Sequence, residues 1–290
     1  MGRKLNQPVD ARSIAQHLGL RLLHGNCQIT AVQSLAESTS GGFCFAKSAE
    51  LAAKADPDCL LLTTEAAGAG RTSATILTTE PRLDFARVLE FLDRHVGFVW
   101  SDVPALVHPS ARIGRNVVLG NGVEIGPDTV ILHNVVIGAE VKIGSGCVIK
   151  SCAVIGEDGF GFERQSNGRA LRLPHIGNVV IGDNVEIGSL TTVCRGTLGN
   201  TVVLDGVKID DHVHIAHNVH IDPDAFVIAC AEISGGVRVG ARSWIAPNAA
   251  ILNQLTIGED AVVGLGAVVV KSVPVGTVVA GNPEIGRAHV

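Results

Sequence analysis

The second part of the chain places an aliphatic residue at every sixth position. The series begins at Val107 and continues through eight steps to Ile155, and Gly followed by two polar residues usually comes after each aliphatic residue. It resumes at Ile181, takes a four-residue insertion, and then runs without a slip from Val203 to Val269. A short fixed period is typical of a solenoid, in which each repeat packs on its neighbours.

Each six-residue repeat predicts a short strand and a turn. Hexads such as IGDNVE, IGPDTV and IGEDAV join a few strand residues to the Gly, Asn or Asp that tight turns need. Three hexads make one turn of a triangular prism, and successive coils lie about 4.8 Å apart, the spacing of a parallel sheet. The pattern therefore predicts a mainly β fold, a parallel β-helix over residues 103–283, followed by a short tail at 284–290.

The period of six is interrupted over residues 156–180. A repeat that stops for this long and then resumes predicts a loop that projects from the prism, and such loops often carry function. Phe160 and Phe162 in this loop are two of only eight Phe in the chain. They either cover a nearby apolar patch or contact a partner, and we count both as candidate substrate-binding residues.

Residues 1–102 lack this period. DARSIAQHLGLRL reads as the start of a helix, with Asp10 or Ser13 as a possible cap. DCLLLTT is a candidate buried strand, and ATILTTEPRLDFARVLEFLDR combines a strand, a turn and an amphipathic helix. These segments predict a small α/β domain in front of the prism.

Composition narrows the classes of partner. Apolar residues make up 46% of the chain but aromatic residues only 3%, which suits thin layers of short strands. The net charge is −5 and no block of Lys and Arg occurs, so we expect no nucleic acid partner. No run of eighteen apolar residues occurs, and MGRKLNQPVD has no apolar stretch behind its basic residues. We therefore expect a cytoplasmic protein without stable membrane insertion.

Four histidines fall within VKIDDHVHIAHNVHI, which at first suggests a metal site. A zinc site on this kind of prism has one His at the third place of a hexad and another five residues later. His217 holds a third place, but Asp222 stands five residues on. His214 and His220 hold the sixth place of consecutive hexads, so they lie on different faces. The seven cysteines show no zinc-binding spacing either, and we expect reduced thiols and no bound metal.

His217 differs from the other histidines in what lies one coil away. Eighteen residues on stands Gly235, within ISGGVRV. A neutral imidazole can accept a proton from an incoming amine, and a Gly N–H can stabilise the oxyanion of a tetrahedral intermediate. The pair suits acyl transfer; the competing interpretation is a surface His beside a turn glycine.

Several segments together resemble the UDP-3-O-acylglucosamine N-acyltransferase family of lipid A synthesis. They are IGDNVEIGSLTTVCRGTLGNTVVLDGVKIDDHVHIAHNVHI, the loop GEDGFGFE, and the N-terminal ITAVQSLAESTSGGFCFA and EPRLDFARVLEFL, in the same order over about residues 30 to 270. The resemblance implies that the β-helix is left-handed and that the protein is a homotrimer with its sites in clefts between adjacent prisms. It also implies that the N-terminal domain binds a nucleotide sugar.

The resemblance further implies roles for particular residues. His217 matches the general base, which deprotonates the sugar amine as it attacks an acyl thioester on acyl carrier protein, and Gly235 matches the oxyanion donor. Asp210, in KIDD, matches an acidic residue near the base, where it either orients the base or is an exposed turn residue. Asn218, next to the base, is a candidate substrate-binding residue. No metal or redox cofactor is needed.

The chain departs from the family pattern at several positions. Phe45 matches the first aromatic residue of the uridine pocket, but Ser48 and Leu51 stand where Asn and a second aromatic residue are expected. Gln254 replaces a second His, and Cys194 replaces an Asp. We take Phe45, Ser48 and Gln254 as further candidate substrate-binding residues.

The end of the chain bears on the acyl donor. Typical members of the family continue as helices that receive acyl carrier protein, whereas this chain ends at VVVKSVPVGTVVAGNPEIGRAHV, which resembles acyl-CoA-dependent hexapeptide acetyltransferases. We expect N-acyl transfer from an acyl carrier protein or coenzyme A thioester to a nucleotide-linked amino sugar. Acetyl transfer from acetyl-CoA and a non-catalytic trimeric scaffold are the alternatives.

Overall fold

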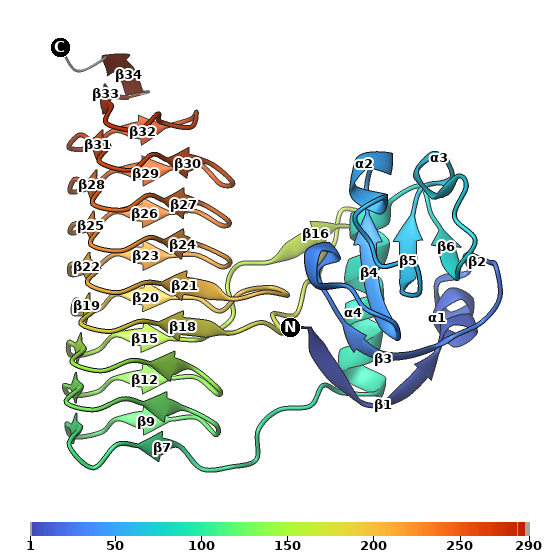
Figure 1. Cartoon of the computed structure of the whole chain (residues 1–290), viewed down its shortest axis with the longest axis horizontal. Helices are drawn as coiled ribbons and strands as arrows, with labels where there is room; N and C mark the ends of the chain where they lie inside the picture. Colours follow the sequence, from blue (N-terminus) through green and yellow to red (C-terminus); the bar gives the residue numbers. More distant parts are fainter. Residues whose placement is uncertain (1, 283, 288–290) are drawn as a thin grey trace. The chain divides into compact units, whose positions relative to one another are not determined.

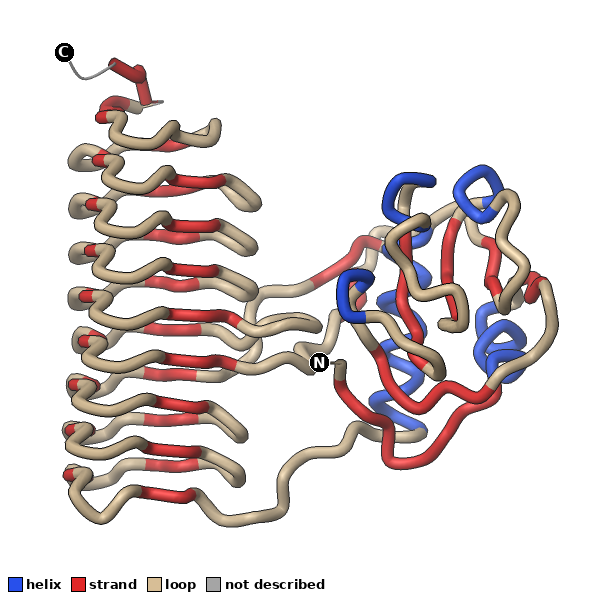
Figure 2. Tube along the Cα trace, in the orientation of Figure 1, coloured by secondary structure: helices blue, strands red, loops and turns tan. Residues whose placement is uncertain are grey.

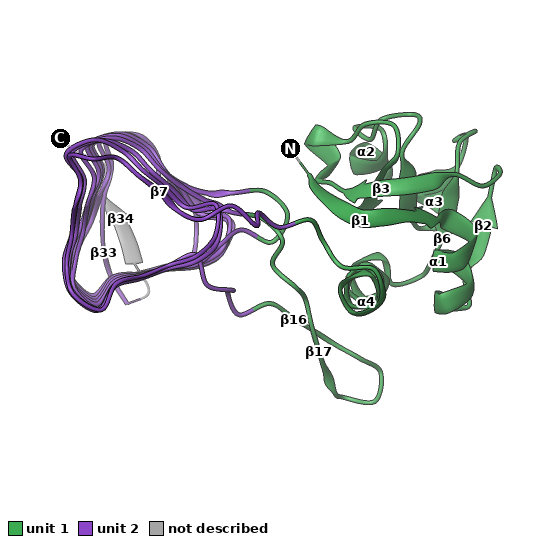
Figure 3. Ribbon diagram, turned by 90° about the horizontal axis from the view of Figure 1, so that it is seen from below, with its two compact units in different colours: residues 1–99, 161–177, 197–199 green, residues 100–160, 178–196, 200–290 purple. Residues whose placement is uncertain are grey.

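The structure, a computed structural model, describes residues 2–282 and 284–287, the last four by their backbone alone. Pro283, in the AGNP segment, and residues 288–290 lie outside the described residues. The chain forms two compact units, shown in two colours in Figure 3. Unit 1 comprises residues 1–99, 161–177 and 197–199, and unit 2 comprises residues 100–160, 178–196 and 200–290.

Unit 1 is built on a six-stranded mixed sheet (Figure 1). Four central strands run parallel, and each edge strand pairs with its neighbour in the antiparallel direction. In spatial order the strands are β1 (Arg3–Asp10), β3 (Gln28–Val32), β4 (Gly42–Ala46), β5 (Leu60–Thr63), β6 (Thr75–Leu77) and β2 (Arg21–Leu23). The helices are α1 (Ala11–Leu18), α2 (Ala49–Ala52), α3 (Glu65–Gly68) and α4 (Pro81–His95), with a 3-10 helix at Leu35–Glu37.

The residues that predicted helices in the N-terminal sequence occupy the helix positions expected of them. The carboxylate of Asp10 accepts a hydrogen bond from the Arg12 N–H at 2.8 Å and so caps α1. Helix α4 begins with Pro81, whose missing N–H costs nothing at that position. Leu89 and Leu92 of α4 are fully buried in the core of unit 1. The α/β fold predicted for this part of the chain is confirmed.

The loop that interrupts the repeat contains a two-stranded antiparallel hairpin, β16 (Phe162–Arg164) and β17 (Ala170–Arg172). The whole loop 156–180 was expected to belong to the β-helix domain, whereas its central part, residues 161–177, packs within unit 1. Leu171 is buried against Leu83 and Ala86 of α4. Burial of an apolar side chain in that contact is the physical reason for the difference.

Unit 2 is a prism of three sheets of short strands separated by turns (Figure 2), and the strands pair in parallel except for β34, which is antiparallel to β33. Sheet I contains β7 (Leu106–Val107), β10 (Glu124–Ile125), β13 (Lys142–Ile143), β18 (Val179–Ile181), β21 (Thr201–Val203), β24 (His220–Ile221), β27 (Arg238–Val239) and β30 (Thr256–Ile257). Sheet II contains β8 (Arg112–Ile113), β11 (Val130–Ile131), β14 (Val148–Ile149), β19 (Glu186–Ile187), β22 (Lys208–Ile209), β25 (Phe226–Val227), β28 (Trp244–Ile245), β31 (Val262–Val263), β33 (Val278–Gly281) and β34 (Glu284–Arg287). Sheet III contains β9 (Val118–Leu119), β12 (Val136–Ile137), β15 (Val154–Ile155), β20 (Thr192–Val193), β23 (His214–Ile215), β26 (Glu232–Ile233), β29 (Ala250–Ile251) and β32 (Val268–Val269).

The strand register confirms the coil length predicted from the period. Glu124 pairs with Lys142 and Glu232 with Ala250, offsets of eighteen residues. Across the four-residue insertion the offset grows to twenty-two, and Thr192 pairs with His214. In the short tail expected at 284–290, residues 284–287 instead pair with β33 as an antiparallel strand.

The second residue of each two-residue strand points into the prism. From Ile125 onward these positions hold Ile or Val at 4% exposure or less, and the core they form contains Val, Ile, Ala and one Cys. Asn, Asp and Gly occupy many of the positive-φ turn positions, for example Asn134, Asp128 and Gly122. Aliphatic side chains of this size fill the narrow axis, which explains the low aromatic content.

Of the helices in the described part of the chain, none combines the length and the apolar character that crossing a bilayer requires.

Candidate active site

The turn that follows β23 carries His217 and is stacked between the turns of neighbouring coils (Figure 1). Strands β23 and β26 pair in register, so Gly235 lies one coil above His217. We call the stacked turns 216–219, 234–237 and 252–255, which join sheet III to sheet I, the histidine corner.

The imidazole of His217 lies against the bare backbone of Gly235. A Cβ built on Gly235 would lie 2.7 Å from Cε1 and 2.8 Å from Nε2 of His217, closer than real Cβ contacts. The Gly236 N–H donates to the His217 carbonyl at 2.9 Å and fixes the spacing of the two turns. Among the described residues, none accepts a hydrogen bond from the Gly235 N–H. The corner therefore offers a ring nitrogen and a peptide N–H side by side.

Asn218 orients the ring of His217. Its Oδ1 lies 3.1 Å from His217 Nδ1, so in one tautomer Nδ1–H donates to the amide and Nε2 is the proton acceptor. Asn218 adopts a left-handed turn conformation with φ 60°, and its N–H donates to Thr201 Oγ1 at 2.9 Å. Both His217 and Asn218 are partly exposed, so the ring is accessible.

Asp210 lies at a different corner of the prism. It follows β22 in sheet II, whereas His217 follows β23 in sheet III, so the two residues stand at opposite edges of sheet III. Asp210 Oδ2 accepts a hydrogen bond from the Ala229 N–H at 3.2 Å. Within one chain the structure does not bring Asp210 to the base, because the width of a sheet separates their turns.

A hollow of about 270 Å³ lies on sheet II beside Asp210. Its charged residues include Lys150, whose Nζ lies 2.6 Å from Glu186 Oε1, and Lys208. Phe226 forms its apolar side and stacks on Trp244 with ring centroids 5.4 Å apart. Asp210 therefore lines this hollow on sheet II and does not belong to the histidine corner.

Gln254 belongs to the histidine corner, two coils above His217. It is exposed, has φ 61°, and its N–H donates to the Gly235 carbonyl at 2.9 Å. A Cβ on Gly236 would lie 3.5 Å from Gln254 Cγ, ordinary van der Waals contact. The structure thus brings His217, Gly235 and Gln254 together in one column of turns.

The candidate residues of the N-terminal domain lie in unit 1. Phe45, on β4, is partly exposed and stacks on Phe85 with ring centroids 4.5 Å apart. Ser48 is exposed and caps α2, because its Oγ accepts a hydrogen bond from the Leu51 N–H at 3.3 Å. Ser48 therefore has a local structural role whether or not it contacts a ligand.

The two aromatic residues of the loop fall in different units. Phe160, in unit 2, is 89% exposed. Phe162, at the start of β16 in unit 1, is 38% exposed, and the guanidinium of Arg172 lies 5.8 Å from its ring centroid. Phe160 is the more accessible of the two to a ligand.

The other histidines have local partners. His214 Nδ1 lies 2.6 Å from Thr192 Oγ1 in sheet III, and His220 Nε2 lies 3.0 Å from Asp222 Oδ1 in sheet I. The two therefore point from different faces, as the hexad positions predicted. Among the described residues, no group of three or more His, Cys, Asp or Glu is arranged to hold a metal ion.

No sequence pattern singled out Arg195, whose turn lies beneath the histidine corner. The side chain of Arg195 is 8% exposed, and its guanidinium lies 4.9 Å from the Trp100 ring centroid. The preceding Cys194 is also buried, and this burial raises the pKa of its thiol to about 11. A lone Arg next to Gly in VCRG was the only sequence signal for Arg195.

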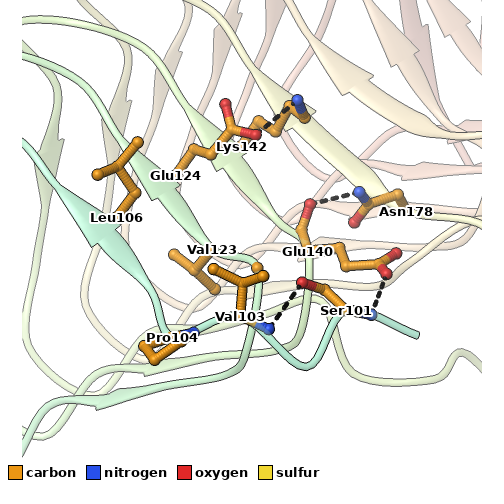
Figure 4. A pocket seen from close by; sticks show the side chains of 10 residues that line it. Ser101, Val103, Pro104, Leu106, Val123, Glu124, Glu140, Lys142 and Asn178 are labelled. Carbon is orange, nitrogen blue, oxygen red and sulfur yellow. Dashed lines mark hydrogen bonds and ion pairs between the residues drawn. The ribbon is translucent and has the colours of Figure 1, made fainter.

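A larger hollow, of about 390 Å³, lies on the first coils of sheet I (Figure 4). Its polar residues engage one another: Lys142 pairs with Glu124 at 2.8 Å, and Glu140 accepts from the Ser101 N–H at 2.7 Å. None of the candidate residues lines it. Size alone therefore does not identify the functional site in this molecule.

Comparison with known families supports the repeat architecture. The Bacterial transferase hexapeptide (six repeats) model matches residues 122–157. The UDP-N-acetylglucosamine O-acyltransferase of Moraxella catarrhalis superposes with a TM-score of 0.57 at 25% identity, over 65% of this chain and 71% of that one. The UDP-N-acetylglucosamine acyltransferase of Francisella novicida gives 0.52 at 27% identity, over 61% and 65%.

Two curated relatives are similar to this chain over more of its length than the family model. The UDP-3-O-acylglucosamine N-acyltransferase of Delftia acidovorans is 37% identical over 211 residues, 69% of this chain and 62% of the relative. The protein of the same name from Coxiella burnetii is 32% identical over 239 residues, 73% of this chain and 70% of the relative. The chain thus spans somewhat under two thirds of the first relative and somewhat more of the second.

Proposed function

Because this chain belongs to the family of UDP-3-O-acylglucosamine N-acyltransferases, we propose that it transfers an acyl group from a pantetheine thioester to the amine of a nucleotide-linked amino sugar. The substrate closest to the relatives' name is a UDP-3-O-acylglucosamine, which would place the reaction in lipid A synthesis in the cytoplasm. The donor is acyl carrier protein or coenzyme A carrying the acyl chain.

The observation that carries this proposal is the contact of the His217 ring with Gly235. A Cβ at position 235 would lie 2.8 Å from His217 Nε2, so the site requires Gly there. A base and an oxyanion donor must both lie near the reacting carbonyl, and adjacent turns supply the two groups without any intervening side chain.

The chemistry follows from these two groups. The sugar amine attacks the thioester carbonyl while His217 Nε2 takes its proton, and the C–N bond forms. The Gly235 N–H donates to the oxyanion of the tetrahedral intermediate. Collapse of the intermediate breaks the C–S bond, and the imidazolium returns the proton to the leaving thiolate. Asn218 holds the ring in the required tautomer through the contact at Nδ1.

A homotrimer about an axis facing sheet III is part of the proposal. The outward-facing positions of sheet III carry fewer charged side chains than those of the other two sheets, and Glu232 is the only Asp, Glu, Lys or Arg among them. These positions are Val118, Val136, Val154, Thr192, His214, Glu232, Ala250 and Val268. Sheets I and II instead present Glu124, Lys142 and Arg238, and Arg112, Glu186 and Lys208. A face with little charge is the one most easily buried between copies.

This arrangement gives Asp210 its role. Asp210 and His217 flank the same sheet at nearly the same level, so rotation about an axis facing sheet III brings Asp210 of one copy towards His217 of the next. The hollow beside Asp210 would then lie opposite the base. The proposed site therefore combines two copies of the chain, although each copy holds its own His217 and Gly235.

An assay with defined donors tests the proposal. The protein is incubated with UDP-3-O-acylglucosamine or UDP-amino sugars and either long-chain acyl carrier protein thioesters or acetyl-CoA, beside His217→Ala. Long-chain transfer that falls by at least about a hundredfold in His217→Ala is expected. His133→Ala is the matched control, because His133 is also third in its hexad but lies at another corner.

Each other outcome contradicts a stated part of the proposal. Acetyl transfer alone would replace the long-chain donor, and no turnover with any donor would favour a non-catalytic scaffold. Retention of most activity in His217→Ala would show that the base has been wrongly assigned.

A further inference from the structure

The coil that carries Arg195 supports the coil that carries His217. Strand β20 pairs with β23, with Val193 opposite Ile215, so the turn that begins with Cys194 and Arg195 lies below the turn that carries His217. The hydrogen bond from the Cys194 N–H to the Ile215 carbonyl, 2.9 Å, continues the ladder into the turn. The turn that contains Arg195 is therefore the next one below the histidine corner in the stack.

Arg195 binds two successive carbonyls at the point where the projecting loop leaves the prism. Its side-chain Nε donates to the Gly156 carbonyl at 2.6 Å, and its backbone N–H donates to the Glu157 carbonyl at 2.9 Å. Nη2 also reaches the Ala139 carbonyl, in the coil below, at 3.3 Å. A single side chain thus joins the first residues of the loop to the coil beneath it.

The surroundings of the guanidinium fix its position. The ring of Trp100 lies against it at 4.9 Å, and the Asp158 carboxylate is 3.9 Å from Nε. A Cβ on Gly138 would lie 2.5 Å from the Gly156 carbonyl oxygen and 3.1 Å from Nη2, so the absence of a side chain there leaves room for the Gly156 backbone and for the guanidinium. The planar donor group of Arg is suited to such multiple contacts, whereas Lys offers one charged point.

Phe160 is the exposed end of this anchored segment. It lies four residues beyond Gly156 in unit 2, and the residue is 89% exposed. Aromatic rings bind the apolar faces of sugars, and a ring that exposed has to be held in place to select a ligand. The segment 156–160 begins after β15, which lies two coils below β23, the strand that precedes His217, and three coils below β26, the strand that precedes Gly235.

We propose that Arg195 is a positioning residue, which fixes the loop segment 156–160 so that Phe160 forms the wall against which the acceptor sugar binds beside His217. This inference rests on the proposed acyltransferase function. It assigns acceptor recognition to the Arg195-held segment and leaves proton transfer to His217.

The first test does not depend on activity. Amide hydrogen exchange of residues 157–160 is measured in the full-length wild type, Arg195→Met, Arg195→Lys and Arg242→Met. Arg242 is the matched control, because it lies in the same unit but is exposed and pairs with Asp260 at another corner. We expect exchange about tenfold faster in Arg195→Met, an intermediate rate in Arg195→Lys and the wild-type rate in Arg242→Met.

The second test measures acceptor recognition in the same variants. Arg195→Met should raise the KM for the amino-sugar acceptor about tenfold, while kcat, its pH profile and the KM for the thioester stay within about threefold of wild type. Phe160→Ala should show the same rise. In the Phe160→Ala background, Arg195→Met should add nothing further, because both substitutions remove one wall.

Several results would overturn the inference. Unchanged exchange at 157–160 in Arg195→Met would show that Arg195 does not hold the segment, and equally faster exchange in strand β23 would show a general loss of stability instead. Additive effects of the Arg195 and Phe160 substitutions on acceptor KM would refute the shared wall. A wild type that neither turns over nor binds a UDP-amino sugar would refute acceptor recognition and the proposed function, while the exchange result would still decide the anchoring role.

Discussion

A side chain at position 235 should affect catalysis much more than the stability of the fold. The three heavy atoms nearest to a Cβ there all belong to the ring of His217, which is the mobile end of a side chain, so the ring can shift while the backbone stays in place. We expect Gly235→Ala to keep the free energy of unfolding within about 1 kcal/mol of wild type while it displaces the ring and lowers kcat about a hundredfold. Steady-state kinetics and urea denaturation measure the two effects.

The control for this change is the neighbouring glycine. Gly236 has φ 71° and its Cβ would make only ordinary contact with Gln254. Asn occupies the same turn position one coil below, at 218, so Gly236→Asn should fold and remain active. Equal loss of activity in both variants would show that the corner is generally sensitive and that the His217 contact is not special.

Cys194 makes stability depend on pH. Burial raises the pKa of its thiol from an ordinary value of 9.0 to about 11, so the folded state holds this proton where the unfolded chain releases it. Its contribution to the free energy of unfolding is therefore complete below pH 9 and is lost as pH rises to about 11, by roughly 2 to 3 kcal/mol. Urea denaturation between pH 8 and 11 should show a smaller decline in Cys194→Ala than in wild type; parallel curves would contradict the assignment.

At the scale of the element, the two residues of each strand have separate functions. In β30, Ile257 is fully buried in the prism axis, whereas Thr256 is exposed on sheet I. Ile257→Ala should lower the free energy of unfolding by about 2 to 5 kcal/mol through lost burial and a cavity, and Thr256→Ala by less than about 1 kcal/mol. Similar losses for both, measured by urea denaturation, would contradict the inward and outward alternation.

The hairpin in the loop shows which structural features a local sequence pattern does not predict. Its position was predicted because the period of six is interrupted there, but its two strands and its packing on α4 were not. Leu171 has no periodic pattern around it, and its burial against Leu83 depends on a helix almost ninety residues earlier in the chain. Contacts between segments so far apart leave no signal in a local pattern.

At the scale of the whole molecule, the proposed site between copies predicts complementation. His217→Ala and Asp210→Asn should each be nearly inactive. When the two variants are unfolded and refolded together, about a quarter of the wild-type number of active sites should return. The reason is that random assembly places an intact His217 beside an intact Asp210 of the neighbouring copy in about one site in four. The mixture should have three times the chain mass of 30.1 kDa by light scattering. A mixture as inactive as its components would place both residues in one copy's site or exclude a role for Asp210.

The repeat allowed much of unit 2 to be predicted. Because the aliphatic positions recur every six residues and three repeats close one coil, the sequence alone determined the strands, the coil length and the stacking of Gly235 over His217. Such neighbours are fixed by chain spacing, since each coil packs on the next. The cap at Asp10 and the buried face of α4 were readable for the same local reason.

Only the tertiary structure decided what the turns bring together. Asp210 is seven residues from His217 in the sequence, yet the corners of the prism hold them at opposite edges of sheet III. Arg195 gave almost no sequence signal, yet its buried guanidinium reaches Gly156 and Ala139, far back along the chain. A periodic pattern specifies which residues stack, because stacking follows from spacing. It does not specify where a long side chain ends or which corner a turn occupies, because those depend on the closed coil.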